Sequence, residues 1–223
     1  MPNARRSLPT FIRMHLATSS IAVGERPKKG TFRPCIDNLP SSTLMGCFRE
    51  HFALKESVAI GVFRPGSYRK EILTYAPFDA CLKTAKLPLT LEYLVPAAGQ
   101  RNVEADVYVV STAEAKKVFT TSPGYWFISL GALRSKGLGQ SSLRYIDEVK
   151  PERRTGTLRA HLRESDARAL GIDLEQDLVR PQYGYLFRPD SYRIGGHYER
   201  ALFTGTILTG PDFLIGEEYS YDH

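Results

Sequence analysis

Segments with the two-residue periodicity of strands alternate along this chain with segments of helical periodicity, and this order restricts the fold more than any other feature. Within residues 8–23, every second side chain from Ile12 to Leu16 is apolar, which predicts a half-buried strand. Residues 89–95 and 103–110 alternate in the same way, and we expect them to pair as antiparallel neighbours through the intervening loop. An apolar strand follows at residues 125–130.

Two helices are predicted between these strands. Ser41 and Ser42 are suitable N-cap residues, and apolar side chains recur at helical spacing after them, which predicts a helix over residues 42–55. Thr112 is placed to cap a second helix over residues 113–120, and the Pro-Gly pair that follows ends it. Further strands are expected at residues 58–63 and 72–75, joined by a turn.

The resulting order of strand, helix, strand, strand, helix and strand is the β-α-β-β-α-β pattern of a ferredoxin-like (RRM-like) unit. The predicted fold class is therefore α+β, with two helices on one face of an antiparallel sheet. We expect residues 1–150 to form this core. Residues 151–223 change in character: a charge-dense, partly helical part precedes β-rich segments at 183–187 and 198–208, so we expect a C-terminal extension that packs on the core.

Composition favours an anionic partner. The chain carries 30 Lys and Arg residues against 24 Asp and Glu, and 20 of its 30 cations are Arg. Arg binds phosphate through a planar fork, and the 12 Tyr and 11 Phe residues offer surfaces for base stacking, so RNA or another single-stranded nucleic acid is the expected ligand. The three cysteines and five histidines lack metal-ligand spacing, and no apolar run is long enough to span a membrane. We expect a soluble cytoplasmic protein without a metal or cofactor.

A glycine-rich loop supplies a place for such a ligand. Residues 131–139 read GALRSKGLG, a G-x5-G-x-G pattern between the apolar strand and a strand over residues 143–149. Glycines allow close approach of a backbone to phosphate oxygens, and the loop itself contributes two cations and a hydroxyl. The pattern is neither a Walker A loop nor a Rossmann fingerprint, because it lacks their spacing.

With this loop, the sequence resembles the RAMP superfamily of CRISPR-associated proteins, which are ferredoxin-like RNA binders. The segment LPSSTLMGCFR at residues 39–49 resembles the family's opening of the first helix. The segments YGYLFRP at 183–189 and FTGTI at 203–207 resemble its C-terminal β segments. The likeness is to the branch that caps the five-prime handle of the CRISPR RNA (crRNA), as in type IV and some type III complexes.

The resemblance implies a subunit of an antiviral effector ribonucleoprotein. Such a subunit holds the repeat-derived handle, contacts the backbone and large subunits, and meets target nucleic acid only indirectly. Carried over to this chain, the resemblance and the basic surface around the loop give the following expected RNA-binding residues: Gly131, Arg134, Ser135, Lys136, Gly137, Gly139, Arg144, Ser41, Ser42, Arg13, His15, Lys28, Lys29 and Arg33.

Two alternatives stay open at this point. A metal-independent endoribonuclease that processes the crRNA precursor would need a general base and a general acid. His15 and His51 are available for these roles, with Tyr68, Tyr75 and Lys136 as conceivable partners. The cleaving branch places its glycine loop near the C-terminus, whereas a long segment follows Gly139 here, so we expect no catalytic activity. The second alternative is a non-CRISPR ferredoxin-like domain that binds an acidic small molecule.

Overall fold

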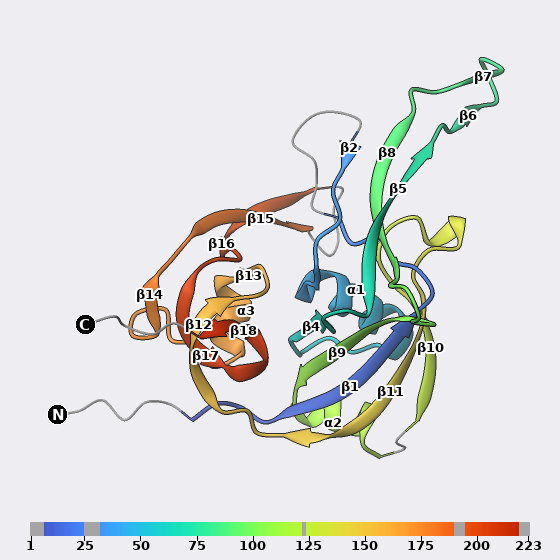
Figure 1. The fold of residues 1–223 in the computed structure, drawn as a ribbon. Helices are drawn as coiled ribbons and strands as arrows, with labels where there is room; N and C mark the ends of the chain where they lie inside the picture. Colours follow the sequence, from blue (N-terminus) through green and yellow to red (C-terminus); the bar gives the residue numbers. More distant parts are fainter. Residues whose placement is uncertain (1–6, 25–31, 122–123, 190–194, 219–223) are drawn as a thin grey trace.

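The computed structural model describes residues 7–24, 32–121, 124–189 and 195–218. Within these residues the protein is a strand-rich, mixed α/β molecule with several sheets and few helices (Figure 1). No helix among the described residues is both long and apolar enough to span a lipid bilayer.

A six-stranded sheet forms the centre of the fold, and the neighbouring strands in it are antiparallel. Its strands, in spatial order, are β10 (Tyr125–Ser129), β11 (Gln140–Val149), β1 (Phe11–Thr18), β9 (Val103–Val110), β4 (Ala59–Phe63) and β3 (Asn38–Leu39). The alternation predicted for β1 is confirmed: Ile12, Met14 and Leu16 are fully buried, whereas Arg13 and His15 are only half-buried. The predicted strands at 58–63, 103–110, 125–130 and 143–149 all belong to this sheet.

Two helices, α1 (Ser41–Phe52) and α2 (Ala113–Phe119), cover one face of the sheet and enclose the main core. Phe48 and Phe119 meet there with ring centroids 5.5 Å apart. The predicted cap of α2 is confirmed, because the Thr112 hydroxyl accepts a hydrogen bond from the Ala115 amide at 3.1 Å. The predicted cap of α1 is wrong. Pro40 holds the N-cap position, and its carbonyl accepts the Thr43 and Leu44 amides.

A long hairpin rises from the body of the protein (Figure 1). It is built from β5 (Tyr68–Tyr75) and β8 (Leu89–Pro96), with β2 (Phe32–Arg33) beside β8 and the short β6 (Phe78–Asp79) and β7 (Thr84–Ala85) at the tip. The predicted pairing of residues 89–95 with 103–110 is therefore wrong: β8 pairs with β2 and β5, and β9 pairs with β1 and β4. Alternation reveals which face of a strand is buried, but it does not identify the strand's partner.

The C-terminal segment makes a second hydrophobic core. Its elements are β12 (Arg153–Leu158), β13 (Leu162–Arg163), α3 (Glu164–Ala169), β14 (Leu178–Arg180), β15 (Tyr183–Pro189), β16 (Gly196–Leu202), β17 (Ile207–Pro211), η2 (Asp212–Leu214) and β18 (Ile215–Glu218). Phe11 and Ile60 of the central sheet are buried in this second core. Phe213 stacks on Tyr108 with ring centroids 3.8 Å apart, so the segment covers the sheet face opposite the helices at one end. The division into units at about residue 150 stays a prediction.

Candidate nucleic-acid interface

The glycine loop, residues 130–139, connects β10 to β11 and is held in shape by the protein itself. It contains a short 3-10 helix, η1 (Arg134–Lys136), between two left-handed residues, Leu133 and Gly137. Its backbone is hydrogen-bonded to residues 20–22, in the segment that follows β1. The Ala132 amide donates to the Ala22 carbonyl, and the Gly139 amide donates to the Ser20 carbonyl, each at 2.8 Å. The loop is thus a preformed surface.

Two of the predicted glycines, Gly131 and Gly139, serve this internal packing. A Cβ atom at Gly131 would lie 2.6 Å from the Ala22 carbonyl oxygen, and one at Gly139 would lie 1.8 Å from the Leu130 carbonyl oxygen. The space beside both is therefore filled by the protein and is not left for a ligand. Gly137 is different, because its φ is +87° and nothing lies within 4 Å of the position that a Cβ would take.

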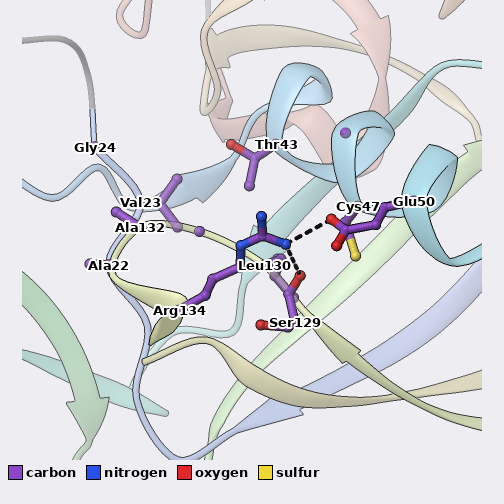
Figure 2. A pocket seen from close by; sticks show the side chains of 12 residues that line it. Ala22, Val23, Gly24, Thr43, Cys47, Glu50, Ser129, Leu130, Ala132 and Arg134 are labelled. Atoms are coloured by element: carbon purple, nitrogen blue, oxygen red, sulfur yellow. Dashed lines mark hydrogen bonds and ion pairs between the residues drawn. The ribbon is translucent and has the colours of Figure 1, made fainter. Parts of the chain in front are cut away.

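A cavity of about 380 Å³, which we call the loop pocket, lies between the glycine loop and α1. Arg134 extends across it (Figure 2). Its Nη1 atom donates to the Glu50 carboxylate at 2.8 Å and approaches the Ser129 carbonyl oxygen at 3.5 Å. This hydrogen bond lowers the pKa of Glu50 and raises that of Arg134. About half of each side chain is exposed, so an anion entering the pocket can compete with Glu50 for the guanidinium.

The wall opposite the loop is one face of α1, because Thr43, Gly46, Cys47 and Glu50 recur at helical spacing. Burial raises the pKa of the Cys47 thiol to about 12, so this sulfur stays protonated and is not a nucleophile at neutral pH. Gly46 lies inside the helix, yet nothing is within 4 Å of its missing Cβ position. Packing within the protein does not explain a glycine there.

A second cavity, of about 310 Å³, lies on the other side of Gly46 at the beginning of α1. We call it the helix-start pocket. Both Ser41 and Ser42 line it, but they differ: Ser42 is exposed, whereas Ser41 is buried beside the Asp166 carboxylate. Gly46 lines both cavities, and we call the two cavities together the groove across α1.

An apolar cavity of about 330 Å³ lies on the far side of the glycine loop, against the hairpin. Arg33 lines it, together with Tyr75 and Leu133. Lys136 extends over the Tyr75 ring, with its Nζ atom 5.0 Å from the ring centroid. The structure thus brings the predicted residues Arg33, Lys136 and the exposed Ser135 to the same loop as Arg134.

Three other predicted residues, Arg13, His15 and Arg144, lie elsewhere. They alternate with core residues, so they occupy the sheet face opposite the helices. Arg13 makes two hydrogen bonds to Asp147, at 2.6 and 2.9 Å, and this raises the pKa of Arg13. The His15 Nε2 atom lies 3.4 Å from a Glu104 carboxylate oxygen. The structure does not join this face to the groove. Lys28 and Lys29 lie outside the described residues.

The histidines invoked for cleavage are separated. His15 is on the sheet face opposite the helices, whereas His51 is on α1, where its Nε2 atom accepts a hydrogen bond from the Ser129 amide at 3.4 Å. Within the part of the chain that the structure describes, no group of three or more His, Cys, Asp or Glu side chains is arranged to hold a metal ion.

Sequence reasoning missed several residues of the groove. Glu50, the partner of Arg134, is 84 positions away in sequence, and only the tertiary structure reveals the pair. The same holds for Arg163, which the C-terminal segment contributes to the helix-start pocket. Gly46 carried a usable signal, because an isolated glycine inside a helical pattern needs a packing or functional reason.

No family model matches the sequence, and no curated protein matches it either. Solved structures do match in fold. A chain of the Type III-B Cmr-beta bound to cognate target RNA and AMPPnP gives a TM-score of 0.55 at 10% identity, covering 88% of this chain and 86% of that chain. A chain of the Type III-B Cmr-beta bound to cognate target RNA gives 0.53 at 9% identity over the same shares. At these identities the likeness is one of fold.

Proposed function

We propose that this protein is a crRNA-binding subunit of a CRISPR effector ribonucleoprotein. It holds the five-prime, repeat-derived handle of the guide and contacts the backbone and large subunits in the cytoplasm. The observation that carries the proposal is the groove across α1, with the cation-bearing glycine loop beside it. The fold likeness to chains of the RNA-bound Type III-B Cmr-beta supports it.

The proposal includes a ferredoxin-like core. We assign its strands and helices, in chain order, as β1, α1, β4, β9, α2 and β11. Each helix then connects two strands that flank a third: β9 lies between β1 and β4, and β1 lies between β9 and β11. In this assignment β10 is an added edge strand, and the hairpin is an insertion between β4 and β9. Both helices lie on one face, as the pattern requires.

In the proposed complex the guide backbone crosses α1 at Gly46. Arg134 exchanges Glu50 for a phosphate in the loop pocket, and Lys136 adds a second cation on the same loop. The apolar cavity beside Tyr75 and Arg33 offers a base-sized space next to these phosphates. Phosphate contacts would fix the register of the strand, and this cavity would take an unstacked base.

The hairpin is the proposed contact with neighbouring subunits. Ile72, Phe78, Leu82 and Leu87 are between 65% and 73% exposed along it. An isolated soluble chain rarely exposes so many large apolar side chains on one projecting element, whereas a subunit covers them on assembly. Figure 1 shows that this element extends away from the central sheet and its helices.

We propose binding without cleavage. His15 and His51 lie on opposite sides of the central sheet, so these two cannot serve together as the general acid and general base at one scissile bond, which supports binding alone. A pairing of one histidine with Tyr68, Tyr75 or Lys136 is tested by the cleavage assay. Fluorescence anisotropy with a short labelled single-stranded RNA tests binding. Electrophoresis of the same RNA after incubation without metal tests for cleavage. We expect saturable binding, intact RNA, and no displacement by a small polyacid such as citrate.

Three outcomes would contradict the proposal. Absence of RNA binding would remove it, and displacement by citrate would favour a small-molecule site. Cleavage that disappears in His15→Ala or His51→Ala would establish a ribonuclease instead.

A further inference from the structure

The helix-start pocket is lined by a buried guanidinium that has one unpaired donor atom. Arg163, at the end of β13, lines this pocket and is only 9% exposed. Its Nε atom is buried and donates to no group among the described residues. Leaving a buried hydrogen-bond donor unpaired costs free energy of folding, and the cost is larger when the donor belongs to a charged group. An anion in the pocket would lie beside this guanidinium and balance its buried charge.

The beginning of α1 favours an anion at the same place. This helix has 12 residues, its first turn contains no acidic side chain, and its N-cap Pro40 offers no side-chain acceptor to the first amides. The free amides and the helix dipole at such a terminus attract negative charge. Ser42, exposed on the pocket wall, adds a hydroxyl that can donate to an oxyanion.

The charge balance of the pocket is positive. Arg49 and Lys55 line it from α1 and the segment that follows, while Arg163 and Arg188 line it from the C-terminal segment. One acidic residue, Asp166, faces them, and burial raises its pKa. Arg188 is already paired with Glu199 at 3.3 Å. Three cations thus remain against one carboxylate.

We propose that the helix-start pocket binds a phosphate group of the guide RNA, with Arg163 as its buried ligand. This inference rests on the proposed function and adds a second phosphate subsite, beyond Gly46 from the loop pocket. Because one wall comes from α1 and the other from the C-terminal segment, a bound phosphate also fastens that segment to the central sheet and its helices.

The first test uses inorganic phosphate alone, with thermal unfolding followed in phosphate and in chloride at equal ionic strength. All the proteins compared carry Arg134→Ala, which removes phosphate binding in the loop pocket, and we expect phosphate to raise the melting temperature of this reference protein. The gain should disappear in Arg163→Met and in the exposed-site variant Lys55→Met, and persist in Arg180→Met, a control on the exposed β14. Asp166→Asn should enlarge it. Equal melting in the two salts, or a gain that survives in both Arg163→Met and Lys55→Met, would overturn the inference.

The second test uses single-stranded RNA in which one phosphate at a time is replaced by a neutral methylphosphonate. One replacement should weaken binding to the wild type by about tenfold, and the same replacement should have no effect on Arg163→Met. If Arg163→Met binds RNA and responds to every replacement as the wild type does, the helix-start pocket is not a phosphate site, and the proposed function still stands. If phosphate raises the melting temperature as expected but the protein does not bind RNA, the proposed function is rejected and the phosphate site stands.

Discussion

Gly46 lies inside α1, where the loop pocket and the helix-start pocket meet, and its replacement by alanine should change stability and binding in opposite directions. Glycine is a poor helix residue because its unfolded backbone has many conformations to lose. At Gly46 the added methyl group meets nothing within 4 Å, so no clash offsets the gain in helix propensity. We expect Gly46→Ala to stabilise the protein by about 0.5–1 kcal/mol.

The same methyl group occupies the floor of the groove. If the guide backbone crosses α1 in contact with Gly46, the strand must move outward or the helix must shift. Overpacking of this kind costs about 1–3 kcal/mol, which corresponds to a loss of RNA affinity between about fivefold and about 150-fold. A variant that is more stable but binds less tightly separates a ligand-contact role from a folding role.

Urea denaturation and RNA fluorescence anisotropy measure the two effects on one preparation. Gly61→Ala is the control for a glycine that packing within the protein does require. Its new Cβ atom would lie 2.8 Å from the Leu39 Cβ, so we expect this variant to be less stable than the wild type. A Gly46→Ala protein with unchanged RNA affinity would refute the path across α1. A Gly46→Ala protein that is less stable than the wild type would refute the claim that nothing in the protein packs against Gly46.

Two further predictions follow from contacts of the groove and the hairpin. Glu50→Gln should raise RNA affinity, because it frees Arg134 and removes a negative charge from the loop pocket; binding titrations measure this, and weaker binding would contradict it. Phe78→Ser with Leu82→Ser should leave melting temperature and RNA affinity unchanged, because both side chains are about 70% exposed. The same double variant should fail to co-purify with partner subunits, and normal assembly would argue against the hairpin as their contact.

Local periodicity predicted much of the central sheet. The alternation in β1 and β9, the Thr112 cap and the apolar pattern of β10 each depend on neighbouring residues, so the sequence alone was sufficient. Strand pairing was not predictable in this way. The buried β4 has no alternation to mark its face, and the sequence does not show that it, and not β8, pairs with β9.

The candidate site was predictable to a similar degree. The glycine loop and its cations were found from spacing, and Arg33 does lie beside them. Arg13 and His15 were grouped with the loop by charge, but the structure places them on the other face of the sheet with acidic partners. The roles of Glu50 and Arg163 depend on contacts between segments far apart in the chain, which composition and periodicity do not encode.

The salt dependence of RNA affinity tests the central claim most directly, because it counts phosphate contacts. Each contact to a single strand contributes about 0.7 to the slope of log affinity against log salt concentration. Arg134→Ala with Lys136→Ala should therefore reduce the magnitude of that slope by about 1.4. Lys117→Ala with Arg180→Ala, two exposed cations outside the groove, should leave it unchanged. An unchanged slope in the loop variant would contradict the assignment of the glycine loop to RNA phosphates.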